Sequence, residues 1–281
     1  MNNFKDFCLG TAQFGMDYGY GDSKKVQEKN IEQIISFYEE NLGVEIDTAK
    51  AYGKSEKIIS KFINKTKVTT KVSFGIDQKK IKQDIEDSLK IFGENLDTVL
   101  VHNPSYLKES PGAIETINKI KNEFNLKNIG ISIYTFEDLI SPFLDTREVL
   151  EVINRIQISC NVFNRNEIES EFFDQLKNNN IEIDFRSIFL QGALLDKKIS
   201  SEIKDNKFSN FFDIWYEYCE INGLKPIEAA ILNLPKTNGK IVFGCRNIKQ
   251  LRELLSIKYT QAPLLYLKEY PPKELTDPRL W

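Results

Sequence analysis

The sequence predicts an α/β fold, a (β/α)8 TIM barrel formed by a single domain. Short apolar segments alternate with longer segments of helical periodicity along the whole chain of 281 residues. Such alternation predicts a parallel sheet joined by crossover helices, and eight repeats of the pair predict that the sheet closes into a barrel. An open, doubly wound sheet is the alternative. Barrels of this length commonly form one domain, so we expect one that extends over residues 1–281.

Eight segments are predicted as strands because they are short, apolar and rich in β-branched residues. They are FCLG (7–10), VEIDT (44–48), VTTKV (68–72), TVLVH (98–102), NIGISI (128–133), RIQISC (155–160), IEIDF (181–185) and KIVFG (240–244).

The segments between them have the spacing of amphipathic helices. In the first helical segment, one face collects the apolar residues, and Gly43 follows as a stop signal. That face consists of Ile31, Ile34, Ile35, Tyr38 and Leu42. The expected helices cover residues 26–41, 55–62, 81–92, 111–123, 136–143, 171–178, 226–234 and 248–255.

Two segments interrupt the alternation: the long connection 191–223 and the tail 259–281. Both are candidates for covering the barrel mouth, and packing on the outside of the barrel is the alternative for the tail. The connection contains an aromatic cluster, for which a helix core is favoured over contact with substrate. The cluster comprises Phe208, Phe211, Phe212, Trp215 and Tyr216.

Composition excludes several classes of function. The chain carries 38 Lys and Arg against 41 Asp and Glu, and no basic cluster, so neither nucleic acid nor a membrane is an expected partner. The four cysteines lie far apart without a C-x-x-C pair, which argues against a metal site and against a disulfide framework. Without a leader or a long apolar segment in the sequence, we expect a cytoplasmic protein, monomeric or weakly homo-oligomeric.

Four residues of catalytic type lie at the ends of three successive predicted strands. Asp47 and Tyr52 follow the second strand, Lys71 lies at the end of the third, and His102 follows the fourth. His102 is the only histidine in the chain. Because reactive groups of a parallel barrel collect at the carboxyl ends of its strands, we expect these four side chains at one rim.

These residue types suit the reduction of a carbonyl group. Hydride delivery leaves an oxygen anion that needs a proton, and a tyrosine can supply it. An ammonium group beside a tyrosine stabilises the phenolate form and so makes the phenol a better donor. Lys71 would supply that ammonium, Asp47 would keep it charged, and a neutral His102 would polarise the substrate oxygen.

Each residue also has an ordinary structural explanation. Asp47 could cap a helix, Tyr52 could pack at a turn, and a lone histidine is usually a satisfied structural group. Lys71 carries more weight because a lysine that ends an apolar strand needs a partner. The combination of four favours catalysis.

At these residues the sequence resembles the aldo-keto reductase family. The resemblance rests on DTAKAYGKSE (47–56), on TTK with Lys71 and on LVHNP with His102. It continues through LGTAQFG (9–15), GISIY (130–134), RIQISCNVFNR (155–165), RSIFLQGALL (186–195) and FGCRNIKQL (243–251). It implies that Asp47, Tyr52, Lys71 and His102 form the catalytic set.

The resemblance also implies that NADPH binds in an extended form across the barrel top. Ser132 and Gln157 would bind the nicotinamide carboxamide, and Gly244, Arg246 and Gln250 would bind the adenosine end, with Arg246 at the 2′-phosphate. The remaining cofactor-binding candidates are Gly10, Thr11, Asp47, Arg186 and Ser187. The absence of G-x-G-x-x-G and of a Walker motif agrees with a cofactor site without a Rossmann domain.

Three positions depart from the family pattern. Ile133 stands where many members have an asparagine after the serine, Arg186 stands where an aromatic residue often stacks on the nicotinamide, and Leu254 replaces an asparagine that contacts adenine. These departures affect cofactor contacts and leave the four catalytic candidates in place.

The expected substrate is a small polar aldehyde, ketone or sugar. The loop NPSYLKES (103–110) is short and offers few apolar walls, and RSIFLQGALL is similar to barrel reductases of sugar or surface-polysaccharide pathways. Two alternatives remain: a non-catalytic barrel that binds nucleotide and regulates a partner, and a lyase that forms a Schiff base on Lys71.

Overall fold

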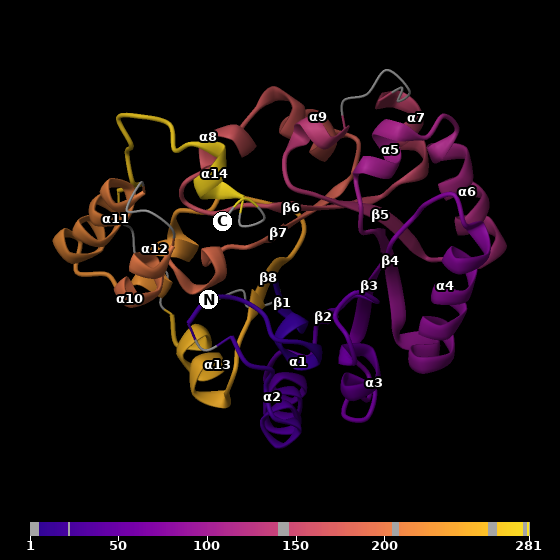
Figure 1. Cartoon of the computed structure of the whole chain (residues 1–281), viewed down its shortest axis with the longest axis horizontal. Coiled ribbons are helices and arrows are strands. Elements are labelled where there is room, and N and C mark those ends of the chain that lie inside the picture. Colours follow the sequence, from indigo (N-terminus) through magenta and orange to yellow (C-terminus); the bar gives the residue numbers. More distant parts are fainter. Residues whose placement is uncertain are drawn as a thin grey trace.

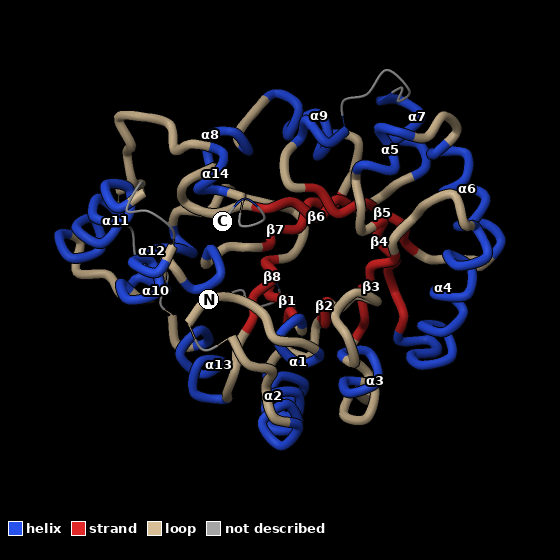
Figure 2. The backbone as a smooth tube through the Cα atoms, viewed as in Figure 1, coloured by secondary structure: helices blue, strands red, loops and turns tan. Residues whose placement is uncertain are grey.

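Eight parallel strands form a closed barrel in the computed structural model of the chain (Figures 1 and 2). The structure describes residues 6–21, 23–139, 146–203, 208–257, 263–277 and 280. The strands follow one another around the barrel in chain order, and β8 pairs with β1. The predicted barrel is confirmed, and the open sheet is excluded. The strands are β1 (Phe7–Gly10), β2 (Glu45–Asp47), β3 (Lys67–Val72), β4 (Leu96–Val101), β5 (Asn128–Ile133), β6 (Arg155–Ser159), β7 (Glu182–Arg186) and β8 (Ile241–Gly244).

Helices surround this barrel, whereas α11 lies to one side of it with α10 and α12 (Figure 1). They are α1 (Ala12–Gly15), α2 (Glu28–Asn41), α3 (Ser55–Ile59), α4 (Gln78–Phe92), α5 (Ser105–Glu109), α6 (Ala113–Glu123), α7 (Thr146–Val152), α8 (Arg165–Ile168), α9 (Glu171–Asn178), α10 (Lys197–Glu202), α11 (Ser209–Ile221), α12 (Pro226–Leu232), α13 (Ile248–Leu255) and α14 (Lys273–Thr276).

The helix expected at 136–143 differs from the structure. Phe136–Leu139 forms a 3-10 turn, and helix α7 begins only at Thr146. Residues 140–143 lie outside the described residues. Tyr134 and Thr135 donate their backbone N–H groups to the Asp138 carboxylate at 2.8 and 3.3 Å. This local turn competes with an α-helix at the same place, because an aspartate can satisfy the backbone of a short turn.

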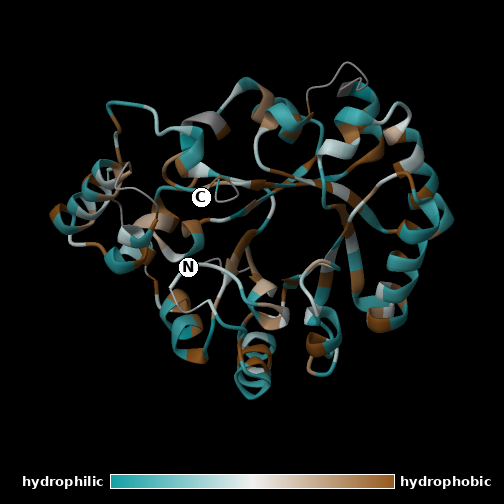
Figure 3. Cartoon of the chain, viewed as in Figure 1, coloured by the Kyte–Doolittle hydropathy of each residue, from teal (hydrophilic) through white to brown (hydrophobic). Residues whose placement is uncertain are grey.

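Helix α2 shows how the sequence pattern produces the packing. Its apolar face is fully buried through Ile31, Ile34, Ile35 and Tyr38. The helix ends where expected: Gly43 has a φ of +57°, and its N–H donates to the Tyr38 carbonyl at 2.8 Å. Glycine adopts this left-handed conformation without strain, which makes it the usual residue after a helix end. Figure 3 shows hydrophilic residues predominating on the outward sides of α4 and α6.

Charged side chains lie at two levels inside the barrel, because alternate residues of each strand point inward. In the lower layer, Arg155 forms ion pairs with Glu45 at 2.8 Å and with Asp184 at 2.7 Å. All three are buried. The upper layer begins two residues further along the strands, with Asp47 on β2 and Arg186 on β7. The lower layer is nearer the amino ends of the strands. Residues at that end of a barrel usually contribute to stability, whereas catalytic residues lie at the carboxyl ends.

A second apolar cluster lies beside the barrel and contains the aromatic residues of α11. Phe208, Phe212, Trp215 and Tyr216 are buried in it, and Phe211 packs against it. Trp215 and Tyr216 donate hydrogen bonds of 2.9 and 2.7 Å to the carbonyls of Leu194 and Ala193, respectively. None of the five aromatic residues lines the main cavity. The expected role as helix core fits this arrangement, and the cluster anchors the connection that follows β7.

The described part of the C-terminal tail packs on α11 and α12. Tyr218 donates to the Pro263 carbonyl at 2.7 Å, and the Leu265 N–H donates to Asn233 at 2.7 Å. Leu275 is fully buried in the second cluster. No described residue of the tail lines the main cavity, whereas Gln191–Glu202 of the long connection contributes several residues to it.

Candidate active site

A cavity of about 1180 Å³ opens at the carboxyl ends of the strands. Small-molecule sites commonly have about 300–1,000 Å³, so this cavity has room for an extended ligand. Lys71 and Gln157 are the two predicted site residues that do not line it; both are 1% exposed and lie beneath its floor. The predicted residues that line the cavity are Gly10, Thr11, Asp47, Tyr52, His102, Ser132, Arg186, Ser187, Gly244, Arg246 and Gln250.

A buried ion pair lies at the floor of the cavity, where Asp47 lines the cavity and Lys71 lies beneath it. The Lys71 ammonium on β3 donates to both carboxylate oxygens of Asp47 at 2.6 Å and to the Thr48 carbonyl at 3.2 Å. Gln157 donates from Nε2 to the same carboxylate at 2.8 Å. Burial by itself would lower the pKa of Lys71, but the Asp47 charge outweighs it and holds that pKa above its ordinary value. Lys71 is therefore a fixed cation.

Tyr52 and His102 lie above this pair and face each other. Their ring centroids are 5.9 Å apart with the planes at 86°, and the Lys71 ammonium lies 5.2 Å from the Tyr52 ring centroid. Burial, followed by the charges of Lys71 and Arg186, lowers the pKa of His102 to about 4. His102 is therefore neutral at physiological pH, so one ring nitrogen carries a proton and the other is an acceptor.

The turn that carries Tyr52 is packed directly against helix α1. A Cβ atom added at Gly15 would lie 1.7 Å from the Tyr52 carbonyl oxygen, and one added at Gly53 would lie 2.5 Å from the Gly15 carbonyl oxygen. Gly53 also has a φ of +59°. The Ser55 hydroxyl contacts Thr11 Oγ1 at 2.8 Å. The backbone of the Tyr52 turn is therefore fixed by contacts that only glycine permits.

Ser132 and Gln157 are paired in register on β5 and β6. Gln157 Oε1 is buried and has no hydrogen-bond partner within the described part of the chain. A buried acceptor left without a donor is unfavourable unless a ligand supplies one. This atom fits an amide N–H₂ group, which a nicotinamide carboxamide carries.

The opposite part of the cavity is built by the segment after β8. Gln250 accepts the Arg246 N–H at 2.7 Å, and Arg246 Nη2 donates to the Lys24 carbonyl. The Asn247 side chain accepts from the Gln250 N–H at 3.0 Å and so begins helix α13. A helix start of this kind favours bound anions. Leu254, a departure from the family pattern, is 2% exposed and also lines the cavity.

The loop after β7 has a strained backbone. Ser187, Leu190 and Gln191 have φ values of +59°, +47° and +53°. Residues other than glycine adopt this region at a cost of about 1–3 kcal/mol each, and such strain is concentrated at functional sites. Ser187 and Gln191 line the cavity.

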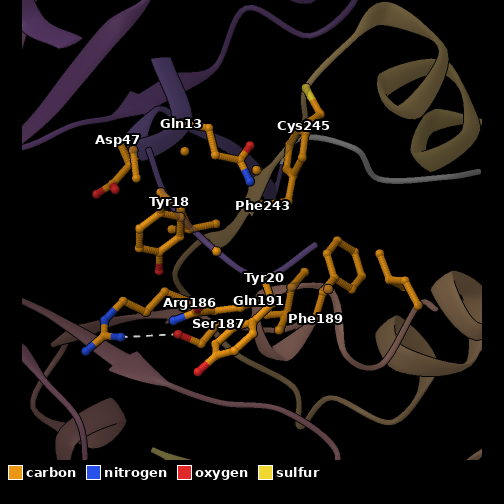
Figure 4. Close-up of a pocket in the computed structure, with 18 of the residues that line it drawn as sticks. Gln13, Tyr18, Tyr20, Asp47, Arg186, Ser187, Phe189, Gln191, Phe243 and Cys245 are labelled. Carbon is orange, nitrogen blue, oxygen red and sulfur yellow. Dashed lines mark hydrogen bonds between the residues drawn. The ribbon is translucent and has the colours of Figure 1, made fainter. Parts of the chain in front are cut away.

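The cavity residues that the sequence analysis did not single out include Gln13 on α1 and Tyr18 and Tyr20 of the loop that follows it (Figure 4). Gln13 lies beside Gly244, and its buried Oε1 has no partner among the described residues. Burial, together with the electrostatic effect of the neighbouring Tyr52, raises the pKa of Tyr18 to about 12, which makes Tyr18 a poor acid. The glycine-rich loop has no periodic pattern, so no sequence signal pointed to these residues.

The described residues contain no group of three or more side chains that could hold a metal ion. No helix within the described ranges is both long and apolar enough to span a membrane. All four cysteines are free and buried.

Comparisons with known proteins agree with this geometry. A model of the aldo/keto reductase family matches residues 6–262. No curated protein matches the sequence. The holo form of an aldo-keto reductase from Bacillus halodurans is 17% identical, with a TM-score of 0.67 over 91% of this chain and 88% of that chain. An aldo/keto reductase from Klebsiella pneumoniae in complex with NADP and acetate is 17% identical, with a TM-score of 0.64 over 91% and 87% of the two chains.

At these identities the solved structures show a shared fold, while the family model spans most of the sequence. The chain therefore belongs to the aldo/keto reductase family of oxidoreductases.

Proposed function

We propose that this protein reduces an aldehyde, ketone or sugar carbonyl with NADPH, or oxidises the alcohol in reverse, with Tyr52 as general acid. The observation that carries the proposal is the arrangement of four side chains at one end of a large cavity. A buried Lys71–Asp47 ion pair lies directly beneath Tyr52, and His102 faces the tyrosine ring.

Each of the four side chains has a distinct role. The Tyr52 hydroxyl gives its proton to the substrate oxygen, and the Lys71 ammonium stabilises the phenolate that remains. Asp47 holds Lys71 in place at 2.6 Å. His102 is neutral above about pH 4, so it orients the substrate oxygen by a hydrogen bond without adding charge.

The residues present fit a nicotinamide cofactor. Gln157 Oε1 and Ser132 would hold the carboxamide, and the start of helix α13 would receive phosphate oxygens near Arg246. Bound NADPH would supply the hydride that the protein cannot. The Klebsiella protein was solved with NADP, which supports the same nucleotide here.

The protonation and burial of Lys71 disfavour the alternative in which this lysine forms a Schiff base. A nucleophilic lysine must lose its proton, whereas Asp47 raises the pKa of Lys71. Lys71 is also 1% exposed and does not line the cavity. A regulatory barrel without catalysis would still bind NADPH, so turnover separates it from a reductase.

The experiment is a fluorescence titration with NADPH and NADH, followed by a screen of small polar aldehydes and sugars at 340 nm. We expect selective NADPH binding that Arg246→Ala weakens, and oxidation of NADPH by at least one carbonyl compound. Absence of binding by either nucleotide would contradict the proposal. Binding without turnover across the screen would favour the regulatory barrel.

A further inference from the structure

Arg186 lies at the end of β7 and lines the cavity. Its guanidinium is partly buried and held by three contacts. Nη2 donates to the Ile133 carbonyl at 3.0 Å, Nη1 donates to the Ser187 hydroxyl at 3.2 Å, and Cζ lies 4.0 Å from the centroid of the Tyr134 ring. Figure 4 shows the contact with Ser187 on the cavity wall. The side chain is oriented before any ligand binds.

None of the three groups that Arg186 contacts carries a negative charge. No carboxylate of the described residues forms an ion pair with Arg186, although its side chain is partly withdrawn from water. The neighbouring carboxylates have other partners: Asp47 binds Lys71 and Gln157, and Asp138 binds Lys108. A partly desolvated cation without a counter-ion is unfavourable, and an anionic ligand would relieve it.

The positive charge of Arg186 reaches the reacting groups. It contributes to lowering the pKa of His102 and acts on Lys71 in the same direction. Lys71 and Arg186 thus place two positive charges beside the single carboxylate of Asp47. The local field therefore favours a ligand with a negative group near the carbonyl.

We infer that Arg186 binds an anionic group of the substrate, so that the preferred substrates are small carbonyl compounds bearing a carboxylate or phosphate. The inference rests on the proposed reduction. Two of the five guanidinium N–H groups donate to Ile133 and Ser187, which leaves three for a ligand. Such a planar fork matches the paired oxygens of a carboxylate or phosphate. The diphosphate of the cofactor has the same chemistry and is the competing source of the anion.

The first test needs no turnover. His102 is the only histidine, so its imidazole resonance reports on this site without ambiguity. Titration with succinate should shift that resonance saturably and raise the pKa of His102, because a bound anion offsets the charge of Arg186. Arg186→Gln should abolish the response, and Arg186→Lys should weaken it. Arg252→Gln is the control, since Arg252 stacks on Phe37 but is exposed and does not line the cavity. An unchanged succinate affinity in Arg186→Gln would overturn the inference.

The second test compares two four-carbon aldehydes, 4-oxobutanoate and butanal, which differ in a terminal carboxylate. Arg186→Gln should raise the KM for 4-oxobutanoate about tenfold or more beyond any change in the KM for butanal, because only 4-oxobutanoate carries the carboxylate. Equal losses with both aldehydes, together with weakened NADPH binding, would assign Arg186 to the cofactor diphosphate and overturn the inference. If succinate binds through Arg186 while the wild type reduces neither aldehyde, the anion site stands and the proposed reduction fails for these substrates.

Discussion

The ammonium group of Lys71 lies 2.6 Å from both carboxylate oxygens of Asp47, and the two side chains are 1% and 5% exposed. This ion pair thus connects the cavity, which Asp47 lines, with the packed barrel interior, in which Lys71 is buried. A buried pair of this kind contributes little net stability relative to apolar residues, but breaking it leaves an uncompensated charge. Its presence at a cavity floor is better explained by chemistry than by folding.

Removing the lysine alone should be strongly destabilising. Lys71→Met leaves Asp47 buried without its cation, and we expect the free energy of unfolding to fall by about 3–5 kcal/mol in urea denaturation. The double variant Lys71→Met with Asp47→Leu should recover much of that loss and remain inactive.

The exposed ion pair of Lys61 and Glu28 provides the control, with side chains 54% and 51% exposed. Lys61→Met should change stability by less than about 1 kcal/mol. If Lys71→Met lowered the free energy of unfolding as little as Lys61→Met does, the burial of the Lys71–Asp47 pair would be contradicted.

His102 should titrate far below an ordinary histidine. Burial and two neighbouring cations lower its pKa to about 4, so an NMR titration of this single histidine should give an inflection there. The activity profile should show no step from His102 between pH 5 and 8. An inflection near 6.5 would contradict the description of the site.

The same shift predicts a pH dependence of stability. The unfolded chain binds the proton near pH 6.5, whereas the folded chain binds it only near pH 4. Stability is therefore lost as the pH falls from about 6.5 to about 4, by about 3 kcal/mol in total, and no further below that. In His102→Gln this part of the loss should be absent, which urea denaturation at several pH values would measure.

Gly15 should be needed to position Tyr52. Gly15→Ala would place a methyl group 1.7 Å from the Tyr52 carbonyl oxygen, so the turn must move. We expect stability to fall by about 1–3 kcal/mol and kcat to fall by about 10- to 100-fold, with NADPH affinity little changed. Gly75→Ala is the matched control because no atom lies within 4 Å of the added methyl. Equal activity of the two variants would refute this role of Gly15.

The strands and the four catalytic candidates could be predicted because their signals are local. Each strand is an apolar segment whose limits differ from the prediction by at most two residues, as for β4 at Leu96–Val101. Asp47, Lys71 and His102 come together because each occupies a strand end, and the barrel topology brings strand ends to one rim.

Other features depend on contacts distant in sequence. The pairing of Arg155 with Glu45 and Asp184 depends on strand register across the barrel, which no single segment reveals. Ser187 and Gln191 adopt left-handed conformations that their residue types rarely choose, so tertiary packing imposes them. The position of Tyr18 in the cavity follows from the fold of an aperiodic loop.

The most direct test of the central claim is the turnover of Tyr52→Phe beside Tyr18→Phe, measured at 340 nm with NADPH and a carbonyl compound that the wild type reduces. The two variants remove the two phenols that face the same space, one above Lys71 and one whose pKa is raised to about 12. We predict that Tyr52→Phe loses turnover by about 100-fold or more while it still binds NADPH, and that Tyr18→Phe remains active. Retained turnover in Tyr52→Phe would contradict Tyr52 as the proton donor.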